Sequence, residues 1–123
     1  MLVWMTIIFI GSSIPGDDIP SEMPPDYLMH FTEYTILGGL IYWWCIEKIL
    51  VSRASMSILF SSILSSGYGL FDEFHQYFVP GRSPDMADWM ADTMGGLCGA
   101  AINMVLLSIL KRRRSWTEKS YGG

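Results

Sequence analysis

The residues best suited to chemistry in this chain lie in one short stretch, Phe71 to Arg82, and at the acidic positions just after it. Carboxylate, imidazole, amide and guanidinium groups all occur there: Asp72, Glu73, His75, Gln76, Arg82, Asp85, Asp88 and Asp92. Such groups can share protons, bind cations or hold an anion. Apolar segments flank them on both sides. Ionisable groups beside membrane-length apolar segments are costly to keep, so they indicate a functional site.

The composition indicates that this site belongs to an integral membrane protein. Of the 123 residues, 50% are hydrophobic and 16% are charged, and the mean hydropathy is +0.31. Ordinary soluble domains carry about 25% charged residues. The length suits one domain.

Four apolar segments must position the polar groups, and they cover residues 1–14, 26–46, 54–78 and 85–110. Helices are expected because the longer segments exceed about 18 residues and do not alternate with a period of two. The last three can span a bilayer core of about 30 Å, whereas the first reaches about 21 Å and is expected to be shortened or tilted. A cleaved signal peptide is the alternative for the first segment, but a basic start and a small-residue cleavage site are missing.

The predicted fold class is therefore all-α, a polytopic membrane bundle of four transmembrane helices over residues 1–114. Residues 115–123 are predicted to be a disordered cytoplasmic tail. Lys48 and Arg53 lie between the second and third segments, and a basic run at 111–114 follows the fourth. The positive-inside rule then places both termini inside and the loops at 16–26 and 79–84 outside. Nucleic acid is not an expected partner, because the basic run is short and directly follows an apolar segment.

Three of the predicted helices bring ionisable groups to one depth, just under the outer surface. At about 1.5 Å per residue, His30 and Glu33 lie roughly 6–10 Å below the outer start of their helix. Asp88 and Asp92 lie roughly 5–10 Å into theirs. The predicted ligand-binding residues of this outer pocket are His30, Glu33, Tyr34, Asp72, Glu73, Gln76, Arg82, Asp85, Asp88 and Asp92.

Small residues lie below these groups on the same predicted faces. They are Gly38 and Gly39 on the second helix, Ser61, Ser65 and Gly69 on the third, and Gly95 and Gly99 on the fourth. A Gly-x-x-x-Gly pair lets a second helix approach closely. The sequence therefore predicts a tight bundle with a polar pocket at its outer mouth.

The chain contains several short motifs: His30-Phe31-x-x-Tyr34, Asp72-Glu73-x-x-Gln76, Pro80-Gly81-Arg82, Asp85-x-x-Asp88 and Gly95 to Gly99. Their combination, over nearly all of residues 1–110, resembles the VanZ-like family of bacterial membrane proteins. The resemblance implies a small multi-pass protein of the cytoplasmic membrane, and the founding member is tied to low-level resistance to the glycopeptide teicoplanin. Family members often have Lys before the motif His, where this chain has Tyr27-Leu28-Met29, and Asn at the position of Asp92.

No cofactor is expected from the motifs, and a divalent metal ion is the one candidate. The candidate metal ligands are His30, Glu33 and Glu73. His-x-x-Glu can present two ligands from one helix face, and nitrogen and oxygen ligands suit zinc or manganese. The alternative is a hydrogen-bond network of neutral or paired side chains between helices.

Arg82 is the only basic residue predicted on the outer side. A guanidinium group can hold a phosphate or carboxylate bidentately, so Arg82 is a candidate anchor for an anionic lipid headgroup or a cell-wall precursor. The alternative is an internal ion pair with Glu73, Asp85 or Asp88.

The leading hypothesis is an envelope protein that binds a lipid-linked or peptidoglycan-related ligand, with membrane lipids as partners, and so changes glycopeptide susceptibility. One alternative is a membrane enzyme acting on phosphorylated lipid headgroups, with Glu73 and Asp88 as candidate catalytic residues. A third hypothesis is a small proton-linked transporter. Transport would call for a homo-oligomer, because four short helices barely enclose a path.

Overall fold

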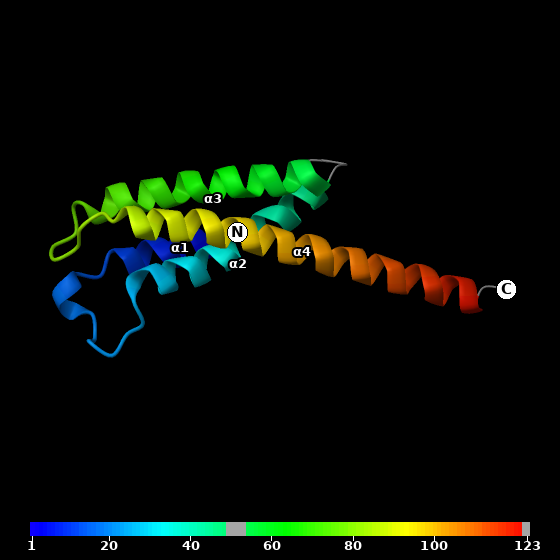
Figure 1. Ribbon diagram of the computed structural model, residues 1–123, viewed down its shortest axis with the longest axis horizontal. Helices are drawn as coiled ribbons and strands as arrows, with labels where there is room; N and C mark the ends of the chain where they lie inside the picture. The colour runs from blue at the N-terminus through cyan, green and yellow to red at the C-terminus, as the bar shows by residue number, and fades with distance from the viewer. Residues whose placement is uncertain (49–53, 122–123) are drawn as a thin grey trace.

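The computed structural model describes residues 1–48 and 54–121, and the side chains of residues 1–47 and 54–114. Its elements are α1 (Leu2–Ser12), a 3-10 turn η1 (Gly16–Asp18), α2 (Asp26–Lys48), α3 (Ala54–Gln76) and α4 (Met86–Tyr121). The predicted all-α class is confirmed for this part of the chain. The loops from α1 to α2 and from α3 to α4 lie together at one end of the bundle, here called the loop end, and α4 continues past the other helices toward the C-terminus (Figure 1). The predicted inner link with Arg53 lies outside the described residues.

The loop-end boundaries of α3 and α4 follow local hydrogen-bonding chemistry. Helix α3 ends at Gln76, two residues before the predicted end, in a turn where the backbone N–H of Val79 donates to the Gln76 carbonyl (2.9 Å). Asp85 does not begin α4 as predicted but caps it, because its Oδ1 accepts the backbone N–H of Ala87 (2.8 Å). A side-chain cap of this kind satisfies a donor that has no partner within the first helical turn.

The far end of α4 differs from the prediction. Disorder was predicted from residue 115, but α4 continues through Tyr121. No proline or glycine occurs between residues 100 and 121, and the basic run at 111–114 consists of good helix formers, so nothing stops the helix at the predicted boundary. Residues 122 and 123 of the predicted tail lie outside the described part of the chain.

Glycines let α2 and α4 pack with their backbones in contact. A Cβ atom added to Gly38 would lie 2.6 Å from the Gly96 Cα, and one added to Gly95 would lie 2.5 Å from the Phe31 carbonyl oxygen. One added to Gly99 would overlap the Thr35 carbonyl. The predicted close approach at Gly38, Gly95 and Gly99 is therefore confirmed.

An adjacent side of α4 packs on the predicted small-residue face of α3. A Cβ atom added to Gly69 would lie 2.7 Å from the Asp92 Cβ, and one added to Gly96 would lie 2.7 Å from the Ser65 hydroxyl. Ser57, Ser61 and Ser65 are fully buried on this face. Helix α4 is thus held between α2 and α3, and this arrangement brings the acids of α3 and α4 to one place.

Helix α1 packs against α2 and α3 near the loop end. The Trp4 indole N–H donates to the Glu33 carbonyl (2.9 Å), and the Tyr68 hydroxyl donates to the Met5 carbonyl (2.7 Å). Ile8 of α1 is buried in a core with Tyr34 and Leu37 of α2. This packing fixes the depth of α1, which its short length alone does not.

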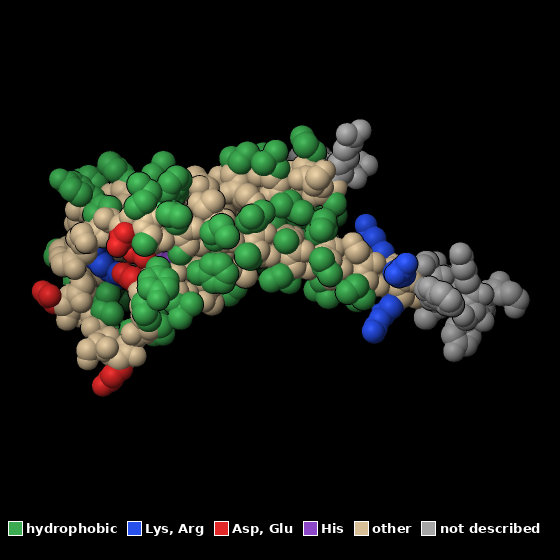
Figure 2. Space-filling view, in the orientation of Figure 1, with side chains coloured by type: hydrophobic (Ala, Val, Ile, Leu, Met, Phe, Trp, Pro, Cys, Tyr) green, Lys and Arg blue, Asp and Glu red, His purple; other side chains and the backbone are tan. Residues whose placement is uncertain are grey.

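In the part of the chain that the structure describes, two helices are long and apolar enough to cross a membrane: α3, and α4 from Met86 to Arg114. Helix α1 is apolar but has 11 residues, and α2 carries acidic residues at both ends. Hydrophobic side chains cover much of the visible flank of the bundle, whereas acidic side chains gather at the loop end with a basic side chain among them, and the other visible basic side chains lie far along α4 (Figure 2). The surface is thus divided into an apolar flank and two polar ends.

The two loops are joined to each other by their backbones. The Gly16 N–H donates to the Pro80 carbonyl (3.0 Å), and Gly81 adopts a left-handed conformation with φ of 73°. A Cβ atom on Gly16 would overlap the Gly81 carbonyl, so only glycine permits this approach. The contact fixes the position of the next residue, Arg82.

Candidate functional site

A buried polar cluster joins α2, α3 and α4 below the loop end. His30 Nδ1 lies 2.9 Å from Asp92 Oδ1, and Gln76 Nε2 lies 3.3 Å from His30 Nε2. All three side chains are buried. His30 thus contacts Asp92 through one ring nitrogen and Gln76 through the other. One histidine therefore links the three helices.

Helix α1 joins the same cluster through a hydroxyl group. Ser12 Oγ donates to Asp72 Oδ2 (2.8 Å), and Gln76 Nε2 lies 3.5 Å from the same oxygen. Ser12 was missed as a site residue. The sequence shows two serines at the end of α1, but their depth relative to Asp72 depends on how α1 packs.

The other acids surround this cluster. Glu73 is buried, and its Oε2 accepts the backbone N–H of Asp85 (2.7 Å), which ties α3 to the start of α4. Asp88 is also buried, whereas Asp85 is exposed. The Tyr34 ring stacks parallel to His30 with centroids 6.3 Å apart and is fully buried. Four buried acids thus stand around a single buried histidine.

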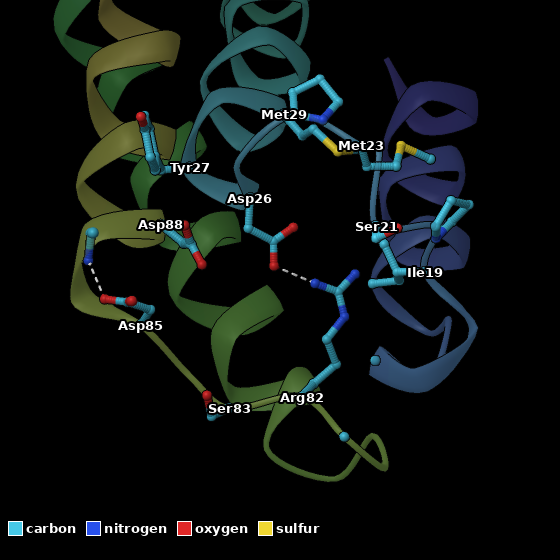
Figure 3. A pocket seen from close by; sticks show the side chains of 15 residues that line it. Ile19, Ser21, Met23, Asp26, Tyr27, Met29, Arg82, Ser83, Asp85 and Asp88 are labelled. Atoms are coloured by element: carbon cyan, nitrogen blue, oxygen red, sulfur yellow. Dashed lines mark hydrogen bonds and ion pairs between the residues drawn. The ribbon is translucent and has the colours of Figure 1, made fainter.

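A pocket of 540 Å³ opens at the loop end, and we call it the loop-end pocket. Arg82 and Asp26 point toward each other across it and form an ion pair, with Asp88 on the same side as Asp26 (Figure 3). Arg82 Nε also donates to the Ile14 carbonyl (3.3 Å). The internal ion pair of Arg82 is therefore made with Asp26 and not with one of the three acids predicted. Asp26 lies one turn before His30, and this i, i+4 spacing was the signal that could have found it.

An apolar groove of 450 Å³ continues from the loop-end pocket along the surface between α2 and α4, and we call it the α2–α4 groove. It is lined by Tyr27, Leu28, Phe31, Ala87, Met90, Ala91 and Met94. Tyr27 and Ala87 line the loop-end pocket as well. A polar pocket and an apolar groove therefore share a wall.

Glu33 lies away from the centre of the cluster. It lines a small cavity of 80 Å³ between α1 and α2, together with His30, Asp26 and Arg82. His75, the second histidine, sits outside the buried cluster, where it contacts the Ser13 hydroxyl at 3.0 Å and stacks on Phe9. The spacing His-x-x-Glu puts Glu33 on the same helix as His30, but the neighbours of His30 come from other helices.

Among the described side chains, two groups of three have nitrogen or oxygen ligand atoms within 4.8 Å of one another: His30, Glu73 and Asp92, and Asp26, His30 and Asp88. Of the predicted metal ligands, His30 and Glu73 thus lie together. Glu33 belongs to neither group, and Asp92 is the third residue of the group that contains His30 and Glu73. The reason is that α4, rather than the next turn of α2, faces His30 across the close glycine contact.

The sequence model of the VanZ/LLP1 family matches residues 1–108 of the chain. No curated protein and no solved structure gives a significant match. The matched residues include all four helices up to the middle of α4 and every member of the polar cluster. The chain therefore belongs to the VanZ/LLP1 family.

Proposed function

We propose that this protein spans the cytoplasmic membrane four times and binds a lipid-linked envelope ligand at its loop end, thereby changing susceptibility to teicoplanin. The headgroup would occupy the loop-end pocket, and the hydrocarbon chain would lie in the α2–α4 groove. The observation that carries this proposal is the wall that the two share, formed by Tyr27 and Ala87. A ligand that is polar at one end and apolar at the other fits this pair of surfaces.

The distribution of charge supports an outward-facing loop end. The basic run at 111–114 belongs to α4, and the part of the molecule far from the loop end carries basic side chains (Figure 2). Arginines after a spanning segment favour the cytoplasmic side. Because α1 is only about 16 Å long, it can serve as the first of the four spans only where the bilayer thins locally around it.

Arg82 supports recognition of an anionic headgroup. Its present partner Asp26 has a side chain that is 44% exposed, whereas the Arg82 side chain is 11% exposed. A phosphate could replace Asp26 as the ion-pair partner of the guanidinium group, because the exposed Asp26 carboxylate can be hydrated once it is released. Bidentate binding of phosphate is the contact for which arginine is best suited.

The test is mass spectrometry of the lipids that co-purify with the protein. We expect Arg82→Ala to lose a lipid that wild type retains, and Ala91→Trp, which fills the α2–α4 groove, to lose the same lipid. Arg112→Ala is the matched control, since it removes an arginine from the opposite end of α4, and it should retain the lipid.

The same variants should be compared for teicoplanin susceptibility in cells that depend on this protein. Arg82→Ala and Ala91→Trp should shift susceptibility together, and Arg112→Ala should not. Identical lipid profiles in wild type and Arg82→Ala would refute the role of Arg82 as an anion anchor. Loss of lipid in Arg82→Ala but not in Ala91→Trp would refute the role of the groove.

A further inference from the structure

The buried group His30, Glu73 and Asp92 has the composition and spacing of a metal centre. Each side chain offers one ligand atom, and these atoms lie within 4.8 Å of one another. Two ligands about 2.1 Å from the same ion are at most about 4.2 Å apart. Closing on an ion therefore requires side-chain movements of less than about 1 Å. We propose that these three residues bind one divalent transition-metal ion, and this site stands independently of the lipid ligand proposed above.

Two of the three residues carry buried oxygens without a hydrogen-bond partner. Glu73 Oε1 and Asp92 Oδ2 are both in this state, and the residues are 5% and 0% exposed. Buried polar atoms in folded proteins are almost always paired, and an unpaired one marks a missing ligand or a functional strain. A cation bound by the two carboxylates would supply a partner of the kind that these side chains lack.

The charge of the cluster also calls for a cation. Asp72, Glu73, Asp88 and Asp92 are all buried, and His30 is the only buried basic side chain among the described residues. Arg82 is already engaged by Asp26 and by the Ile14 carbonyl. Like charges this close are costly in a medium of low dielectric, so the excess must be offset by bound protons or by a metal ion.

One imidazole nitrogen with two carboxylate oxygens suits Mn²⁺ or Zn²⁺ better than Mg²⁺ or Ca²⁺, which prefer oxygen ligands alone. The second group, with Asp26 and Asp88, is a weaker candidate because Asp26 is exposed and paired with Arg82. Access is available from the loop end. His30 lines the 80 Å³ cavity, and Asp26 and Arg82 line both this cavity and the loop-end pocket.

The experiment uses full-length protein in detergent, purified through a tag without histidine, stripped with chelator and dialysed against Mn²⁺ or Zn²⁺. Elemental analysis should give about one ion per chain for wild type. Glu73→Gln and Asp92→Asn should each weaken binding by about tenfold or more, because each replaces an anionic carboxylate ligand with a neutral amide. Glu33→Gln is the matched control, since it neutralises a nearby acid outside both ligand groups, and it should bind as wild type does.

A spectroscopic readout on wild type keeps the proposal testable if an acid variant fails to fold. Pulsed electron paramagnetic resonance of the Mn²⁺-loaded protein should show coupling to an imidazole nitrogen. The chain has two histidines, so the signal should persist in His75→Ala. Substoichiometric metal in wild type, absence of the nitrogen coupling, or unchanged binding in both Glu73→Gln and Asp92→Asn would overturn the site and leave shared protons as the source of charge balance.

Discussion

Replacing His30 with leucine is expected to destabilise the protein by about 3–5 kcal/mol, because it leaves Asp92 as a buried charge without its partner. Asp92 is fully buried, its Oδ1 depends on His30 at 2.9 Å, and its Oδ2 has no other partner. The loss should appear as a lower midpoint of thermal unfolding in detergent without added metal. The midpoint is measured as the temperature at which half of the protein remains monodisperse after heating.

A second substitution reveals whether the buried charge causes this loss. Asparagine at Asp92 keeps the size of the side chain and removes its charge. His30→Leu with Asp92→Asn should therefore be more stable than His30→Leu alone. His75→Leu is the matched control, because His75 lies outside the buried cluster, and it should have a much smaller effect. Equal losses from the two histidine substitutions would contradict the pairing, as would a further loss in the double variant.

Adding one methyl group at Gly99 should also be strongly destabilising, whereas the same change at Gly67 should not. A Cβ atom at Gly99 would overlap the backbone carbonyl of Thr35, and a backbone atom cannot rotate away as a side chain can. The helices must move apart, at a typical cost of about 1–3 kcal/mol. Gly67 has no atom within 4 Å of an added Cβ, so Gly67→Ala should be neutral or stabilising by up to about 1 kcal/mol.

The informative result is that Gly99→Ala should lower the stability whereas Gly67→Ala should leave it unchanged or raise it. Thermal unfolding in detergent measures the stability of both variants. Gly38→Ala, on the facing helix, should match Gly99→Ala because it meets the backbone of Gly96. If Gly99→Ala were as stable as Gly67→Ala, the backbone contact between α2 and α4 would be wrong. The convergence of His30 and Asp92 would lose its physical basis as well.

The positions of the helices and the convergence of their polar groups could be predicted from sequence because both follow from local patterns. The apolar runs predicted the loop-end boundaries of α2, α3 and α4 to within a few residues. The glycine spacing predicted the close contact of Gly38 with α4. His30 and Asp92 were predicted to share one depth from the rise per residue alone. They also lie on facing sides of their helices.

The contacts that were missed depend on packing over long separations in the chain. Ser12 reaches Asp72 because α1 is fixed by Trp4 and Tyr68, and no local pattern sets that depth. Arg82 pairs with Asp26 because the two loops are joined at Gly16 and Gly81. The length of α4 was missed for another reason. A basic run ends a membrane span but does not end a helix.

Labelling with a membrane-impermeant maleimide in intact cells tests most directly whether the loop-end pocket and the cluster beneath it face the cell exterior. Ser83 is exposed and lines the loop-end pocket, so a cysteine there samples the site itself. The wild-type chain, with Cys45 and Cys98, provides the background. Ser83→Cys is expected to be labelled in intact cells, whereas a cysteine appended after Gly123 is expected to be labelled only once the membrane is permeabilised. Labelling in the reverse order would contradict an outward-facing loop end.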